Sequence, residues 1–295
     1  MSDIVLVAET GSDIPSELAQ KYGIHMVPMH VAFGDETLDD GTFPAERICE
    51  YYDRTKEVPK TSACSPADFT KVFDEIRASQ PGKHILHLAY SAVTTSSYQS
   101  ALISASSYPP GAITSIDTKQ VSVGQAAVVI KTAELLKAEP GLSLEAVIKA
   151  VRQFCRQVHM CFLPDNLEYL RAGGRVSNAA YMGSRILNLH PCIEIIDGVL
   201  TAAKKYRGSL KKVVPRLIRD TAQKYGLNKD HLYLVRSPGL DASVCETAET
   251  AVRECGFREI SWMSTGCVIT THGGPGCIGL IGFSDSSTEE YGTDS

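Results

Sequence analysis

The stretch His84–Ala101, "HILHLAYSAVTTSSYQSA", passes from an apolar run of strand length into a turn rich in hydroxyl side chains. Short apolar runs that end at turn residues are typical of buried β-strands. Ligands of open α/β sheets bind beyond the carboxyl ends of the strands, which is where this turn lies. Ser91, Thr94 and Thr95, with a helix N-terminus behind them, offer donors for a carboxylate or a phosphate, although helix capping would also explain them.

Strands and helices alternate around this stretch throughout the first half of the chain. Strands are predicted over 3–9, 24–33, 84–90 and 112–118, and helices over 12–23, 44–54, 65–79, 121–138 and 144–157. The polar residues 34–41 predict a turn or a hairpin. Alternation at this spacing predicts an α/β fold in which a parallel sheet has helices on both faces, a three-layer α/β/α domain.

The second half predicts a mixed sheet with helices. Asp197-Gly198 stands between two β-like runs, which indicates a hairpin. The other expected elements are strands over 158–164, 231–237 and 258–264, helices over 166–188 (with a glycine break), 209–226 and 240–256, and a core segment over 267–283. We expect an N-terminal α/β domain over 1–160, a C-terminal α/β domain over 161–283 and a flexible tail over 284–295.

The composition argues against several classes of function. Hydrophobic residues make up 43% of the chain and charged residues 21%, as in globular proteins. The net charge of −5 and the lack of a long Lys/Arg block argue against a nucleic-acid partner. The acidic start "MSDIVLVAET" does not resemble a signal peptide and no run approaches a membrane span, so we expect a cytoplasmic protein without an integral membrane segment. The nine cysteines include no C-x-x-C pair and predict buried thiols instead of a metal site.

Three further segments are unusual in their polar or glycine content: "PKTSACSP" (59–66), "LRAGGRVS" (170–177) and "TTHGGPG" (270–276). The first adds the hydroxyls of Thr61 and Ser62. In the second, a Gly-Gly step lets backbone come close to a neighbour and Arg175 adds a fixed positive charge, although a glycine C-cap with a charge matched to the helix dipole is an equal explanation. In the third, His272 lies where the backbone must turn sharply or approach a ligand. The candidate backbone positions are Gly173, Gly174, Gly274 and Gly276.

The sequence has none of the common nucleotide, zinc-protease or serine-hydrolase motifs, and no carboxylate pair stands out. Hydrogen-bond donors without an accompanying set of catalytic residues predict a binding protein and not an enzyme.

Taken together, these segments resemble the DegV family of fatty-acid-binding proteins, over residues 3–283. "LEYLRAGGRVS" (167–177) is similar to the family's Leu-x-Tyr-Leu-(Arg/Lys)-x-Gly-Gly-Arg-(Ile/Val)-Ser segment, and "THGGPGCIGL" (271–280) to its His-x-Gly-Pro-Gly segment. Four others correspond in the same order: "PKTSACSP" (59–66), "IDTKQVSVG" (116–124), "IIDGVL" (195–200) and "KKYRGSLKKV" (204–213).

The resemblance implies one long-chain fatty acid, such as palmitate or stearate, bound without a cofactor between two α/β domains. Thr61 and a serine of the turn after residue 90 would bind its carboxylate, with Arg175 and His272 near the head group. It also implies a partner, a bacterial fatty acid kinase that converts the presented acyl chain to acyl phosphate for phospholipid synthesis. The basic residues that match a family segment and would help to dock that kinase are Lys204, Lys205 and Arg207.

The chain departs from the family pattern at the head-group turn. The usual Ser-Ser pair is Ser91-Ala92 here and the usual Ser-Gly-Thr is Thr95-Ser96-Ser97. A further departure lies near the first predicted strand, where Glu9 and Thr10 stand in place of the usual Asp and Ser. Ser91 is the first choice for the carboxylate-binding hydroxyl, with Thr94 or Thr95 as substitutes. The alternative function is a phosphotransferase-type enzyme that acts on a small hydroxy or keto compound, with His272 as the phosphoryl or proton carrier.

Overall fold

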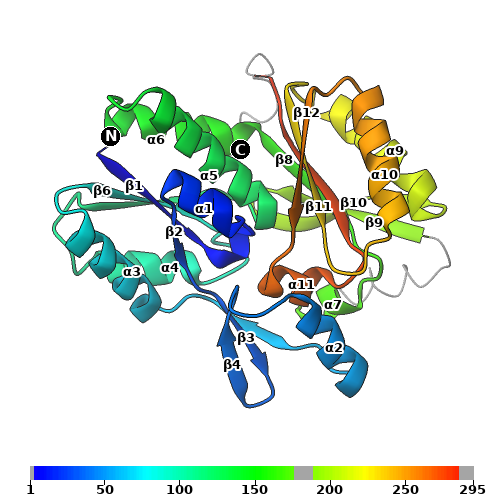
Figure 1. Cartoon of the computed structure of the whole chain (residues 1–295), viewed down its shortest axis with the longest axis horizontal. Helices are drawn as coiled ribbons and strands as arrows, with labels where there is room; N and C mark the ends of the chain where they lie inside the picture. The colour runs from blue at the N-terminus through cyan, green and yellow to red at the C-terminus, as the bar shows by residue number, and fades with distance from the viewer. Residues whose placement is uncertain (1–2, 176–188, 286–295) are drawn as a thin grey trace, which may run out of the picture.

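The computed structural model describes residues 3–175 and 189–285. Its chain forms two α/β lobes that lie side by side, each built on one sheet (Figure 1). The first lobe holds a four-stranded sheet and the second a six-stranded sheet. A small three-stranded sheet lies below the junction of the two lobes in this view.

The four-stranded sheet is wholly parallel and runs in the order β2-β1-β6-β7. Its strands are β1 (Ile4–Glu9), β2 (His25–Val27), β6 (His84–Ala89) and β7 (Ile113–Asp117). Every residue of β1 is buried, as is typical of a parallel strand with helices on both faces. The predicted parallel sheet is confirmed, and the quoted turn begins directly after β6.

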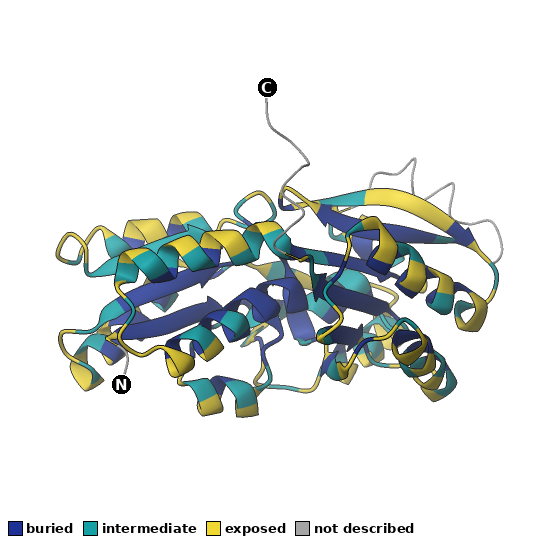
Figure 2. Cartoon of the chain, turned by 90° about the horizontal axis from the view of Figure 1, so that it is seen from above, coloured by how far each residue is buried: buried dark blue, intermediate teal, exposed yellow. Residues whose placement is uncertain are grey.

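Two groups of helices cover the two faces of this sheet (Figure 1). The elements are η1 (Thr10–Ser12), α1 (Ser16–Tyr22), α3 (Pro66–Ser79), α4 (Ser97–Ala105), α5 (Ser122–Ala138) and α6 (Leu144–Gln157). Helices α1, α5 and α6 pack on one face, and α3 and α4 on the other. The central strands are buried and the helices expose their outer faces (Figure 2). The predicted three layers are therefore confirmed.

The small sheet was not predicted from the sequence. The single strand expected over 24–33 is two strands interrupted at Pro28, because β2 joins the parallel sheet and β3 joins the small antiparallel one. The small sheet contains β3 (His30–Phe33), β4 (Glu36–Asp39) and β5 (Lys60–Ser62), with α2 (Glu46–Thr55) between β4 and β5. Strand β5 was expected only as a polar segment, and it carries Thr61.

The six-stranded sheet is mixed and runs in the order β10-β9-β8-β13-β11-β12. Its strands are β8 (Val158–Leu163), β9 (Leu189–Ile196), β10 (Val199–Arg207), β11 (His231–Arg236), β12 (Glu259–Ser264) and β13 (Ile278–Phe283). The predicted hairpin is confirmed, since β9 and β10 pair antiparallel around Asp197 and Gly198, which both have positive φ. The division predicted at residue 160 falls inside β8, which belongs to this second sheet.

The second lobe has four described helices. They are α7 (Glu168–Ala172), α9 (Leu210–Lys224), α10 (Ala242–Glu254) and α11 (Cys267–Gly273). The stretch 267–283, expected only as core, is thus divided into a helix and a strand. The helix predicted over 166–188 is described only as far as residue 175, and most of the predicted tail also lies outside the described residues.

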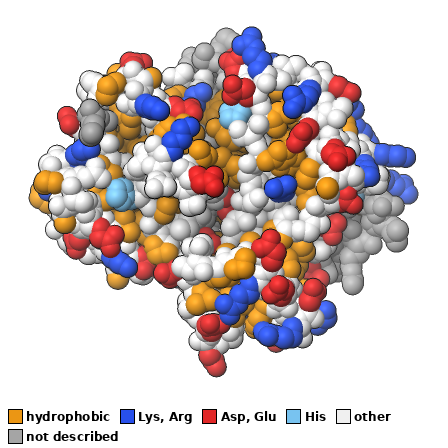
Figure 3. Space-filling view, in the orientation of Figure 1, with side chains coloured by type: hydrophobic (Ala, Val, Ile, Leu, Met, Phe, Trp, Pro, Cys, Tyr) orange, Lys and Arg blue, Asp and Glu red, His pale blue; other side chains and the backbone are white. Residues whose placement is uncertain are grey.

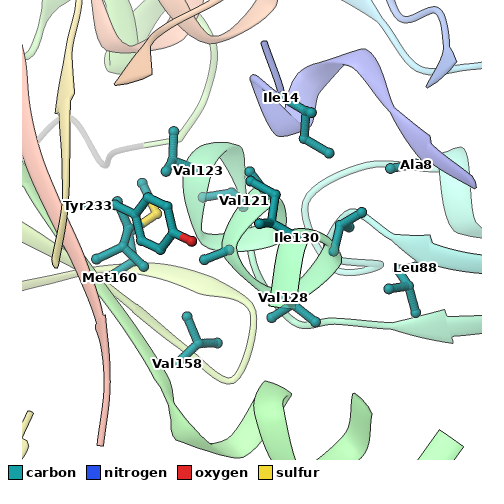
Figure 4. Packing of buried hydrophobic residues seen from close by; sticks show 14 of the residues in the cluster. Ala8, Ile14, Leu88, Val121, Val123, Val128, Ile130, Val158, Met160 and Tyr233 are labelled. Carbon is teal, nitrogen blue, oxygen red and sulfur yellow. The ribbon is translucent and has the colours of Figure 1, made fainter. Parts of the chain in front are cut away.

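One hydrophobic cluster joins the two lobes. Its centre is α5, whose Val123 lies close to Met160 of β8 and Tyr233 of β11 (Figure 4). Helices α9 and α10 cover the opposite face of the six-stranded sheet with a second cluster. The two sheets therefore share α5, and the seam beside it is where a site between the lobes is formed. None of the described helices is long and apolar enough to span a bilayer.

Candidate ligand-binding site

A cavity of about 290 Å³ lies between the lobes, near the lower end of the range for small-molecule pockets. Part of its lining is apolar: Val121, Met160, Phe162, Leu170, Leu200 and Val235. Another part is polar: Thr61, Ser62, Thr94, Thr95, Arg175 and His272. Both lobes contribute to both parts, so the cavity exists only where the lobes meet.

Thr61 and His272 meet across the lobes. Thr61 is held by β5, which pairs with β3 opposite Val31, and His272 lies in the last turn of α11. The Thr61 hydroxyl oxygen lies 2.9 Å from Nε2 of His272, which is hydrogen-bond distance. The two residues are 211 positions apart in the chain, so only the packed lobes bring them together.

The imidazole of His272 is neutral near pH 7. Burial lowers its pKa to about 4, and the positive charge of Arg175 acts in the same direction. Nδ1 is buried and has no hydrogen-bond partner among the described residues. An unpaired lone pair is cheaper to bury than an unpaired N–H, which favours the tautomer with the proton on Nε2. Nε2–H then donates to Thr61, and the hydroxyl proton of Thr61 is left to donate to a ligand.

The glycines explain how α7 and α11 come so close. A Cβ on Gly173 would lie 2.3 Å from Nδ1 of His272, so only glycine fits beside the ring. A Cβ on Gly274 would lie 2.7 Å from the Tyr169 ring, and Gly274 also has φ +74°. Gly276 packs in the same way against Asp165, with φ +70°. Gly173 and Gly274 thus allow α7 and α11 to pack closely, and Gly276 allows the chain after α11 to pack against Asp165, which precedes α7.

Gly174, with φ +71°, has nothing near its missing Cβ and ends the helical turn in the left-handed conformation. The glycine C-cap that the sequence left open is therefore present. Arg175 follows it and is exposed, but its guanidinium does more than complement the helix dipole. It donates to the carbonyl of Gly173, and across the lobes to the carbonyl of Thr94 at 3.1 Å. A guanidinium has five N–H donors, so these contacts leave others for an anion in the cavity.

The turn after β6 divides its hydroxyls between two roles. Thr94 and Thr95 line the cavity together with Ser96. Ser91 is fully buried, donates to the carbonyl of Gly198 at 2.8 Å, and is not among the described residues that line the cavity. Ser91, the first choice for binding the carboxylate, thus fastens the β9–β10 hairpin to the first lobe. Thr94 and Thr95, its substitutes, line the cavity.

The candidate docking residues lie elsewhere. Lys204, Lys205 and Arg207 are exposed on β10, an edge strand of the six-stranded sheet. Lys204 pairs with Asp220 of α9 at 2.5 Å. Acidic and basic side chains are interspersed over both lobes on the face shown in Figure 3.

Two buried carboxylates of the first lobe hold the start of α11, and neither was predicted from the sequence. Asp13 accepts the backbone N–H of Gly266 at 2.6 Å and the hydroxyl of Ser122. Asp40 accepts the backbone N–H of Cys267 at 2.9 Å. Burial raises the pKa of both carboxyl groups. The first lobe therefore holds α11 at both ends, by these carboxylates at its start and by Thr61 at its end.

Glu9 and His87 form a second buried polar pair, next to the turn that follows β6. Nε2 of His87 lies 3.2 Å from Oε1 of Glu9, and both side chains are fully buried. Burial alone would raise the pKa of Glu9, but His87 and the hydrogen bonds from Tyr90 N–H and Gln125 bring it below its ordinary value. Glu9 thereby fixes the backbone of Tyr90, which lines the cavity. Over the described ranges, no three His, Cys, Asp or Glu side chains are grouped to hold a metal ion.

The chain is similar in sequence and in fold to known proteins. The DegV family model matches residues 3–285. A fatty-acid-binding DegV family protein from Thermus thermophilus has a solved structure that is similar with a TM-score of 0.85, at 28% identity, over 96% of this chain and 99% of that one. A stearic-acid-binding protein from Eubacterium ventriosum is similar with a TM-score of 0.81, at 25% identity, over 96% of this chain and 98% of that one. A fatty acid-binding protein from Thermotoga maritima is 27% identical over 94% of this chain and 96% of its own length. The chain belongs to the DegV family.

Proposed function

We propose that this member of the DegV family binds one long-chain fatty acid in the cavity between its lobes and presents the carboxylate to a fatty acid kinase. The observation that carries the proposal is the pairing of Thr61 with His272 across the lobes, at a polar part of a cavity that also has an apolar part. The related proteins described as fatty-acid binders support it.

The apolar lining suits the tail of such a ligand. Each buried methylene contributes about 0.8 kcal/mol, so ~14 methylenes give roughly 11 kcal/mol of gross transfer energy before the tail is ordered. Side chains from both lobes line this part of the cavity, Val121 from the first and Phe162, Leu200 and Val235 from the second. Palmitate and stearate are therefore the ligands we expect, and the site requires no cofactor.

The polar lining suits the carboxylate. A buried carboxylate without partners would cost several kcal/mol or take up a proton, so it needs charge-assisted donors. The hydroxyl of Thr61, the remaining N–H groups of Arg175 and the hydroxyl of Thr95 supply them, whereas the hydroxyl of Thr94 donates to the carbonyl of Ser91. Ser62 lies next to Thr61 on β5 and adds a further hydroxyl.

The protein would act as a carrier and not as an enzyme. A phosphoryl or proton carrier must be open to both donor and acceptor, whereas the ring of His272 is held between Gly173 and Thr61. Its low pKa also makes it a poor proton carrier near pH 7. Exposed Arg175 marks the side from which a kinase would reach the carboxylate, and Lys204, Lys205 and Arg207 would help to dock it.

Mass spectrometry of the purified chain tests the carrier function. We expect one acyl chain per protein under native conditions, and palmitate or stearate in the solvent extract. Thr61→Val and Arg175→Ala should each lower the occupancy, whereas Thr250→Val and Arg258→Ala, at exposed positions that do not line the cavity, should not. An empty wild-type protein that also fails to take up added stearate would refute the proposal.

The kinase partnership needs its own test. The acyl-loaded chain is mixed with a bacterial fatty acid kinase and ATP, and acyl phosphate is measured. A Lys205→Glu, Arg207→Glu double variant should keep its bound fatty acid but lose most acyl phosphate formation, and it leaves the pair of Lys204 with Asp220 intact. Full acyl phosphate formation by this variant would exclude β10 as the docking surface.

A further inference from the structure

A second set of hydroxyl groups lines the same cavity. Ser122, Ser237 and Thr265 all face it, and each is at least nine-tenths buried. Ser237 follows β11, Thr265 follows β12, and Ser122 is the first residue of α5. None of the three belongs to the group around Thr61 and His272.

These hydroxyls form one contiguous polar strip. Strands β11 and β12 pair up to their last residues, and the N–H of Thr265 donates to the carbonyl of Arg236 at 2.9 Å, so Ser237 and Thr265 leave the sheet side by side. Asp13 then links the strip to Ser122, because it accepts from the Ser122 hydroxyl and from the N–H of Gly266, the residue after Thr265.

The strip lies away from the head-group site. Helix α11 separates Thr265 from His272, and seven residues at 1.5 Å per residue place them about 10 Å apart along the helix axis. A ligand whose carboxylate lies at Thr61 would therefore pass the strip partway along its tail.

Up to two hydroxyl protons of the strip have no acceptor among the described residues. The Ser237 oxygen accepts the N–H of Cys277 at 2.8 Å, and its own proton has no partner. Thr265 and Thr270 share one hydrogen bond of 2.7 Å, and when Thr270 is its donor the hydroxyl proton of Thr265 has no partner either. A plain hydrocarbon tail would leave these donors buried and unpaired, which is costly. Ser122 adds strain at the same place, with φ +48°.

We propose that the preferred ligand is a fatty acid with an oxygen atom partway along its chain, a mid-chain hydroxy fatty acid whose oxygen accepts from Ser237 or Thr265. This inference rests on the proposed fatty-acid binding. The hydroxyl of the ligand can in turn donate to the oxygen of Ser122, so a single group would complete the strip. An ordered water is the competing occupant, and it would favour a plain tail, because the hydroxylated one would have to displace it.

Binding to the delipidated full-length chain tests this by isothermal titration calorimetry. The ligands are stearic acid, 10-hydroxystearic acid and, as a control with its hydroxyl beside the carboxylate, 2-hydroxystearic acid. One hydrogen bond gained by the mid-chain hydroxyl should make 10-hydroxystearate bind about fivefold more tightly than stearate. The control ligand should show no such preference.

Variants then locate the preference. At least one of Ser237→Ala and Thr265→Val, the one that removes the donor, should bring the ratio of the two affinities close to one. Ser104→Ala, which removes an equally buried hydroxyl of α4 outside the cavity, should leave the ratio unchanged. Stearate binding without a preference for 10-hydroxystearate, or a preference that survives both strip variants, would overturn this inference alone. Failure of all three acids to bind would overturn the proposed function and this inference with it.

Discussion

Replacing Gly173 by alanine should weaken fatty-acid binding through His272, without touching the ligand directly. The added Cβ would lie 2.3 Å from Nδ1, whereas ordinary contacts begin near 3.4 Å, so the ring must retreat by about 1 Å. Nδ1 faces Gly173 and Nε2 faces Thr61, so the ring cannot move without disturbing the 2.9 Å bond that orients the Thr61 hydroxyl.

The expected loss follows from the bond at risk. A hydrogen bond to a charged group contributes about 1.5–3 kcal/mol, which corresponds to roughly a tenfold to hundredfold loss of affinity for stearate. Affinity is measured by calorimetry on the delipidated protein, and folding by chemical denaturation. Gly141→Ala, at a loop glycine with open space around its missing Cβ and an ordinary φ, is the matched control.

A double-mutant cycle shows whether the effect passes through the imidazole. If it does, Gly173→Ala should cost almost nothing in a His272→Ala background, where there is no ring to displace. Wild-type affinity in Gly173→Ala, or an equal loss in both backgrounds, would refute the argument that this glycine exists to seat His272.

Three further outcomes are expected. The pKa of His272 is about 4 in the folded state and 6.5 for a free imidazole, so the unfolded state binds the proton first as the pH falls below 6.5. This group alone should therefore lower the free energy of unfolding by up to about 2 kcal/mol between pH 7 and pH 5, and His272→Gln should flatten that part of a plot of stability against pH. Ser91→Ala should lower the free energy of unfolding by about 1–2 kcal/mol, since Gly198 loses its donor, but should reduce stearate affinity less than Thr61→Val does; a larger effect on affinity would return Ser91 to the head-group site. Asp40→Ala, which uncaps α11, should lower the free energy of unfolding by about 1–2 kcal/mol in urea titrations, and an unchanged unfolding midpoint would show that the cap is unimportant.

The alternation of apolar runs and capped helices was enough to predict most of the fold, because each of those signals is local. Ser65 caps α3 through a reciprocal bond with Asp68, and Gly198 allows the tight hairpin turn. The prediction of a single strand over 24–33 was wrong because the local sequence does not show which sheet each half of it joins. Its two halves have similar composition, and only the partner strands, β1 for one and β5 for the other, decide which sheet each half joins.

Most of the polar cavity lining was also predicted, since Thr61, Thr94, Arg175 and His272 stand in unusual local sequences. Asp13 and Asp40 gave no such signal. Asp13 lies among polar residues that read as an ordinary helix start, and Asp40 lies in a polar turn. Both act on the N–H groups of a helix more than 200 residues away, a pairing that no local pattern contains.

Ligand binding and the packing of the lobes are connected through α11. Helix α11 carries His272 at one end and follows Thr265 at the other, and the first lobe fixes it through Asp40 and Thr61. Separation of the lobes would break these bonds and open the cavity together. A ligand that binds only the closed form must therefore stabilise the packing of the lobes, by an amount that grows with its concentration. Because the head-group donors and the hydroxyl strip are fixed to the same short helix, a ligand that engages both would hold that helix at two points instead of one.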